Sequence, residues 1–100
     1  MTMKFIQVMT AKEAEPLCKL AFFENQDTQQ LLIGRYGDFD LFAHYTQCHK
    51  RKDRWHFVIE SSNGSVCGSG YDSCQAAIDA GVAAAKEQIE LRMLKFQDLP

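Results

Sequence analysis

The side chains in this sequence that are best suited to acid–base or nucleophilic chemistry are its histidines and cysteines. His44 and His56 fall in two segments with strand-like alternation and would flank one another across a strand pair. Acid–base catalysis needs titratable groups gathered in a pocket, whereas this pattern predicts surface strand residues. Cys74 falls in the first turn of a predicted helix, where the helix dipole favours a thiolate. It also begins the apolar stripe of that helix, so we interpret it as a buried core thiol.

A zinc site is the sharpest metal hypothesis, because His44, Cys48 and His49 are close in sequence. The chain has no C-x-x-C pair, however, and its cysteines are scattered over segments that look core-facing: Cys18, Cys48, Cys67 and Cys74. Disulfides would need an export signal, and none is visible. We therefore predict free buried thiols, with no metal and no cofactor.

The sequence also lacks the motifs that bind phosphate or build a nucleophile. There is no P-loop, no G-x-G-x-x-G and no nucleophile elbow. Gly68-Ser69-Gly70 precedes a helix and superficially suggests phosphate binding, but the neighbouring Asp72 argues against an anion there. We predict that the protein is not an enzyme.

Four basic side chains gather between two predicted strands, namely Lys50, Arg51, Lys52 and Arg54. They could grip phosphates while Trp55 and Tyr45 stack on bases. The formal net charge of -2 instead favours a solvated hairpin loop. A nucleic-acid-binding module is therefore our alternative hypothesis.

Several large apolar residues fall on the wrong side of their own predicted stripe. They are Leu20, Phe23, Phe42, Leu91 and Leu94. Such residues either form a second side of the core or anchor a partner. We predict that Phe23, Phe42, Leu91 and Leu94 bind a partner, and a homodimer also stays open.

Size and composition limit the kind of protein that must position these residues. With 100 residues, 46% hydrophobic and 24% charged, the sequence predicts a single globular domain over 1–100. Its start lacks the apolar run of a signal peptide, and no segment is long enough to span a membrane. We expect a cytoplasmic location and no membrane partner.

The first quarter of the chain predicts an edge strand or lead-in over 4–9 and then a helix within 11–25. Thr10 and Glu13 form a capping-box pattern. Pro16 would be costly deep inside a helix, so a start near Glu15 is an alternative. Polar residues over 25–30 predict a loop.

Strand signals fill the middle of the chain. The segments 31–36 and 39–47 are separated by a Gly37-Asp38 turn, and the second of them alternates clearly. The segments 55–60 and 65–70 flank Asn63-Gly64, a pair typical of tight hairpins. Gly68 predicts close approach of another backbone or a large side chain.

A long helix follows, capped by Asp72 or Ser73. Its apolar residues recur at steps of four and three and define one face: Cys74, Ile78, Val82, Ala85, Ile89, Met93 and Phe96. We interpret Gly81 as a point where the helix lies close to Trp55 or Phe57. The predicted fold is α+β, an antiparallel sheet of about four strands with an N-terminal helix and a long C-terminal helix packed on one face.

Residues 55–84 resemble the YegP-like family of small bacterial domains of unknown function. The likeness lies in the aromatic-rich strand 55–59, the Asn63-Gly64 turn, the return strand 66–69, and an alanine-rich helix that contains Gly81. The family usually pairs two such units, and this chain has no clear second copy. The resemblance implies a β-β-α unit and no catalytic residue.

A looser likeness, of size and build only, is to antitoxin and anti-CRISPR proteins from mobile elements. Together with the missing catalytic motif and the off-stripe apolar residues, it leads to our functional prediction. We predict a small non-enzymatic binding protein that inhibits or regulates a larger protein or nucleoprotein complex, in the manner of a phage anti-CRISPR protein.

Overall fold

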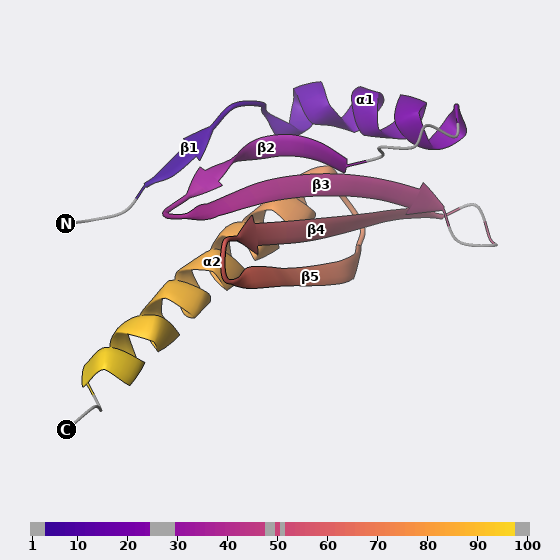
Figure 1. Cartoon of the computed structure of the whole chain (residues 1–100). Helices are drawn as coiled ribbons and strands as arrows, with labels where there is room; N and C mark the ends of the chain where they lie inside the picture. The colour runs from indigo at the N-terminus through magenta and orange to yellow at the C-terminus, as the bar shows by residue number, and fades with distance from the viewer. Residues whose placement is uncertain (1–3, 25–29, 48–49, 51, 98–100) are drawn as a thin grey trace.

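The computed structural model describes residues 4–24, 30–47, 50 and 52–97, and their side chains as far as Arg92. Its elements are β1 (Phe5–Gln7), α1 (Ala11–Phe23), β2 (Gln30–Tyr36), β3 (Phe39–Gln47), β4 (Asp53–Ser61), β5 (Gly64–Tyr71) and α2 (Cys74–Gln97). The predicted α+β class is confirmed (Figure 1). The sheet has five strands rather than four, because the segment before α1 pairs as a short edge strand.

The sheet is an antiparallel meander in the order β1-β2-β3-β4-β5. β3 shows the alternation that its sequence predicts, since Leu41, Ala43 and Tyr45 are buried while Phe42 and His44 on the other face are only half-buried. Because successive side chains of a strand point to opposite faces, one face of the sheet carries the core.

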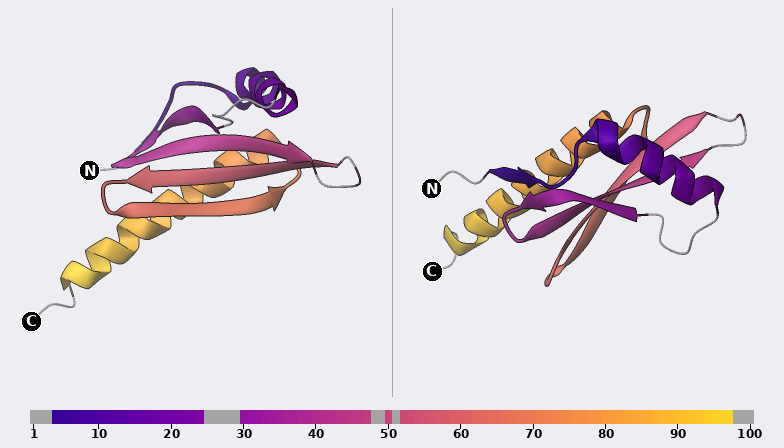
Figure 2. Two further views of the ribbon diagram at one scale, coloured as in Figure 1. Left: turned by 45° about the vertical axis from the view of Figure 1, so that its right-hand side comes forward. Right: turned by 90° about the horizontal axis from the view of Figure 1, so that it is seen from above.

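Both helices pack on that core face. The Sγ of Cys18 in α1 lies 3.8 Å from the carbonyl oxygen of Ala43, and the rings of Phe22 and Tyr45 meet edge to face. From the other helix, Cys74 and Ile78 are buried in the same core. Figure 2 shows α2 crossing the sheet obliquely and extending beyond it.

α1 begins at Ala11, so the alternative start near Glu15 is wrong. Thr10 and Glu13 complete a reciprocal capping box, in which the backbone N–H of Glu13 donates to the Thr10 side chain. This cap satisfies N–H groups that the helix leaves without partners and holds the first turn ahead of Pro16, which the helix accommodates in its interior.

Ser73, not Asp72, caps α2. Its Oγ accepts a hydrogen bond of 3.1 Å from the backbone N–H of Ala76. Of the predicted stripe, Cys74, Ile78 and Ala85 are buried, and Val82 and Ile89 pack partly against the core. The side chains of Met93 and Phe96 lie outside the described residues.

The tight hairpin that Asn63-Gly64 predicted is present between β4 and β5, with a loop shorter than the predicted strand bounds 55–60 and 65–70 implied. Ser61 pairs with Gly64, which makes Ser62 and Asn63 the two loop residues. Gly64 begins the return strand at φ 137°, where other residues are strained. The preceding charged loop is also shorter than predicted, because β4 already begins at Asp53.

The ring of Phe57 explains two of the glycines. A Cβ on Gly68 of β5 would overlap Cε1 of Phe57, and a Cβ on Gly81 of α2 would overlap Cδ1 of Leu41 and lie 3.2 Å from Cγ of Phe57. The predicted close approach at Gly81 is confirmed for Phe57 rather than for Trp55. Small residues here let β5 and α2 close over one aromatic ring.

We expect Gly81→Val to lower the free energy of unfolding by about 1–3 kcal/mol, because the added carbons overpack the contact with Leu41 and Phe57. Urea denaturation monitored by far-ultraviolet circular dichroism measures this. The matched control is Ala83→Val on the exposed side of the same helix, which loses only helix propensity, below about 0.7 kcal/mol. Equal decreases in the free energy of unfolding of the two variants would show that the contact at Gly81 has room for a larger side chain.

Candidate binding surface

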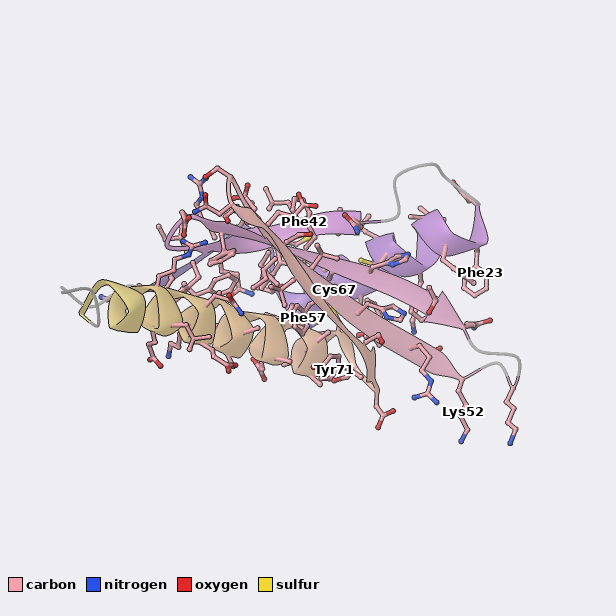
Figure 3. All side chains as sticks on the ribbon, turned by 60° about the horizontal axis from the view of Figure 1, so that its bottom comes forward. Phe23, Phe42, Lys52, Phe57, Cys67 and Tyr71 are labelled. Carbon is pink, nitrogen blue, oxygen red and sulfur yellow. The ribbon has the colours of Figure 1, made fainter. Side chains whose placement is uncertain are left out.

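The face of the sheet opposite the helices is the candidate functional site. Its strand register aligns four residues across the central and outer strands, which we call the apolar row: Leu32, Phe42, Val58 and Cys67. Leu32 is 41% exposed, Cys67 is exposed, and Phe42 and Val58 are half-buried. Figure 3 shows Phe42 and Cys67 on the sheet, with Phe57 and Tyr71 toward α2. No helix among the described residues covers this row.

A pair of histidines borders the apolar row on one side. His44 and His56 are direct cross-strand partners, as the sequence predicted, and their ring centroids are 5.4 Å apart. Nε2 of His56 lies 2.7 Å from Oγ1 of Thr46. Burial lowers the pKa of both imidazoles, and the charges of His44 and Arg54 lower that of His56 further. Near neutral pH these rings are therefore uncharged and add aromatic surface to the row.

Basic side chains lie beyond the histidines, at the β3–β4 end of the sheet. Arg54 is opposite Thr46 on the open face, and Lys50 and Lys52 are exposed in and after the connecting turn. Arg51 lies outside the described residues. Asp53, the first residue of β4, is on the helix side, where it accepts a 2.6 Å hydrogen bond from the Tyr45 hydroxyl.

Asp53 is held by a small network on the core face. The hydrogen bond from Tyr45 is the main cause that lowers the pKa of Asp53, and Lys19 of α1 adds an ion pair of 3.4 Å. Lys19 also pairs with Glu15 at 3.3 Å. This network connects α1 to the first residue of β4, next to the β3–β4 connection. It also directs the carboxylate of Asp53 away from the basic side chains on the open face.

Acidic side chains border the apolar row on its other side. Asp40 and Glu60 are cross-strand partners on the open face, and Arg35 pairs with Asp40 at 3.1 Å. The charge of the open face therefore changes along the direction of its strands. It has two carboxylates at one end, one of them paired with Arg35, then apolar and aromatic groups in the middle, and the basic side chains of Arg54, Lys50 and Lys52 at the other end.

The predicted partner-binding residues do not come together. Phe23 is 62% exposed at the end of α1, Phe42 is on the open face, and Leu91 is 48% exposed on α2. The side chain of Leu94 lies outside the described residues. Leu20, half-exposed on α1, is on a surface separate from Phe42.

The predicted role of Trp55 in stacking on bases is wrong for this fold. Its side chain is 1% exposed on the core face, where its ring lies 5.0 Å from that of Tyr45, which is equally buried. The register that puts His56 on the open face necessarily turns Trp55 inward.

The buried thiols are poorly suited to nucleophilic chemistry. Burial raises the pKa of Cys74 to about 12 and that of Cys18 to about 11, so both are thiols at neutral pH. Of the suggested zinc ligands, Cys48 and His49 lie outside the described residues. The described part of the chain contains no group of three or more side chains that could hold a metal.

Sequence reasoning missed most of the apolar row. Leu32, Val58 and Cys67 belong to three different strands, and each is unremarkable in its own segment. One signal was present in the sequence: the alternation of His56, Val58 and Glu60 placed Val58 on the face of its strand that the buried aromatic residues do not occupy.

No protein-family model, curated protein or solved structure matches this chain. The resemblance to the YegP-like family over 55–84 thus stays a prediction, although the β-β-α unit that the pattern indicated is present as β4, β5 and α2. In the described ranges, no helix combines the length and apolar character needed to cross a membrane.

The histidine pair predicts a pH dependence of stability. The folded chain binds these protons less readily than the unfolded chain, whose histidines titrate near the ordinary pKa of 6.5. The free energy of unfolding should therefore be fully maintained above pH 6.5 and should decrease as the pH falls through 6.5 toward the lower folded pKa values. Urea denaturation at a series of pH values measures this. The variant His44→Gln/His56→Gln should flatten the slope in that window, and an unchanged slope would contradict the assignment.

Proposed function

We propose that this chain is a non-enzymatic binding module that docks another protein on the open face of its sheet. The observation that carries the proposal is the apolar row on a face that neither helix covers. Exposed apolar side chains that lie side by side mark interaction sites more often than scattered ones do. Phe42 is central in this row and offers the largest side chain to a partner.

The charges around the row indicate the chemistry of the partner. Its surface would present an apolar ridge over Phe42 and Val58, acidic groups toward Arg54 and Lys52, and a basic group toward Glu60, since Asp40 is already paired with Arg35. Opposed charges at the two ends of one surface fix the orientation of the bound partner and exclude surfaces of the reversed polarity.

In this proposal the protein acts by occupying a surface, as an inhibitor or regulator of a larger protein or nucleoprotein complex. An anti-CRISPR protein of a phage is one example of such an inhibitor. The support is physical. The buried thiols of Cys18 and Cys74 have raised pKa values, and the described chain holds no metal-binding cluster, which leaves a surface as its best-supported means of action.

We expect Phe42→Lys to weaken binding to the partner protein at least about tenfold, because it removes the central apolar contact and introduces a charge between partner and sheet. Affinity capture identifies the partner, and calorimetry with the purified partner measures the change. The matched control is Phe23→Lys, an equally drastic change of an exposed phenylalanine on α1. Loss of binding in the α1 variant, with binding retained in the sheet variant, would move the site off the open face.

Single-stranded nucleic acid is a second candidate, and one specific arrangement favours it. The rings of Phe42, His44 and His56 are neighbours on the two adjacent strands β3 and β4, beside Arg54 and the two exposed lysines. Stacking rings next to cations is the arrangement that binds single strands without strong sequence preference. It replaces the buried Trp55 and Tyr45 as the stacking surface.

Fluorescence anisotropy with single-stranded DNA and RNA oligonucleotides tests this second candidate. Binding should weaken steeply with added salt, and Lys50→Ala/Lys52→Ala/Arg54→Ala should reduce both the affinity and the salt dependence, because fewer counterions are released. Phe42→Ala should reduce the affinity with the salt dependence unchanged. A protein that binds no oligonucleotide at low salt would eliminate this candidate and leave the protein partner.

A further inference from the structure

The outer edge of β5 is a long hydrogen-bonding surface. β5 is the last strand of the sheet, and among the described residues no strand pairs with its outer side. Its eight residues, GSVCGSGY, contain no charged side chain and no proline. Exposed edges are usually protected from other strands by lysine, proline, a bulge or a covering segment. The first five residues of β5 have no lysine, proline or bulge, and no described strand pairs with their outer side.

The opposite side of the sheet is treated differently. There β1 pairs with the end of β2, and the chain leading to α1 continues along the edge, with the backbone N–H groups of Val8 and Met9 both donating to the carbonyl of Ile33 at 2.8 and 3.1 Å. The chain thus covers a large part of the β2 edge, whereas no strand in the described ranges pairs with the outer side of β5.

The register of the hairpin tells which backbone groups point outward. In a two-residue hairpin the closing pair, here Ser61 and Gly64, is hydrogen-bonded, and such pairs alternate along the ladder with pairs that do not exchange hydrogen bonds. Val66 and Gly68 therefore bond to β4, while Ser65 and Cys67 direct their N–H and C=O groups to the free edge.

A bulge limits the usable stretch of this edge. The register shifts between Trp55 and Phe57 of β4, and β5 supplies an extra residue there, with Gly70 at φ 88°. The regular stretch is therefore Gly64–Gly68, and its centre is Val66.

We propose that two copies of this chain pair antiparallel through β5, with the two-fold axis at Val66. In this register Ser65 of each copy faces Cys67 of the other, so the outward groups of these residues form four hydrogen bonds. Val66 meets Val66 and Gly64 meets Gly68 across the axis. The stretch is self-complementary, and no like charges meet at it, which favours a second copy over an unrelated strand.

The dimer would be one ten-stranded sheet with both open faces on the same side. The apolar rows of the two copies would lie next to each other, offset by two residues or roughly 7 Å along the strands. The dimer does not depend on the proposed function, but it would double the binding surface. Because only five residues of each copy form the contact, we expect a weak dimer whose population rises with protein concentration.

Sedimentation velocity at concentrations rising into the millimolar range tests the dimer. Ser65→Pro should abolish it, because proline removes an outward N–H without breaking a bond to β4. The control Ser65→Ala keeps that N–H and should dimerise like the unmodified chain. Circular dichroism establishes that both variants are folded.

Disulfide trapping gives a second readout that does not depend on the proline variant. In a Cys48→Ser/Cys67→Ser background, Val66→Cys should form an intermolecular disulfide, because opposed residues in a pair without hydrogen bonds have Cα atoms about 4.5 Å apart. The control Ser62→Cys, in the exposed hairpin loop, should not. A chain that stays monomeric at every concentration and is not trapped at Val66 would overturn the proposal. So would amide protection of β5 that appears only when the partner protein is added, since the edge would then belong to that partner.

Discussion

The contact on which most of the architecture depends is the enclosure of the Phe57 ring between two glycines. Gly68 of β5 and Gly81 of α2 both lack the Cβ that would overlap Phe57 or its neighbour Leu41. Each glycine costs stability in its own element, since glycine is a poor former of strands and helices. In return α2 lies close against β3 and β4. The long helix packs on the same face of the sheet as α1, and among the described residues neither helix covers the opposite face.

The side chains on the open face are set by the alternation of the strands. Strand alternation sends Leu41 and Phe57 to the helices and their neighbours Phe42 and Val58 to the other side. Aromatic residues of the strands and small residues of the helices fill the core face, and Phe42 lies outside this core. The charged groups then differ along the strands, with Glu60 and the Asp40–Arg35 pair at one end and Arg54 at the other. The polarity of the surface is thus a consequence of register and not of any local cluster in the sequence.

Local features of this protein were predicted from the sequence, whereas features that join distant segments were predicted only in part. The alternation of 39–47, the capping box at Thr10 and the close approach at Gly81 were all predicted, because each depends on neighbours within a few residues or on the volume of one side chain. The site was predicted only in part. Phe42 was singled out for its position off the buried face, whereas Leu32 and Cys67 were missed because nothing in their own segments marks them. Trp55 was assigned to stacking on bases because it is next to a basic turn, and burial on the core face overturned that assignment.

The sequence by itself determined the elements, their order and the two faces of each strand, because backbone propensity, capping and two-residue alternation act over short distances. It also determined that β5 carries no charge or proline. Only the tertiary structure decided which face the helices cover, which strand is left at the edge, and which side chains become neighbours in the apolar row. Those outcomes depend on strand register and on the packing of helices against a sheet, which join residues far apart in the chain and are settled by the volume and shape of the whole core.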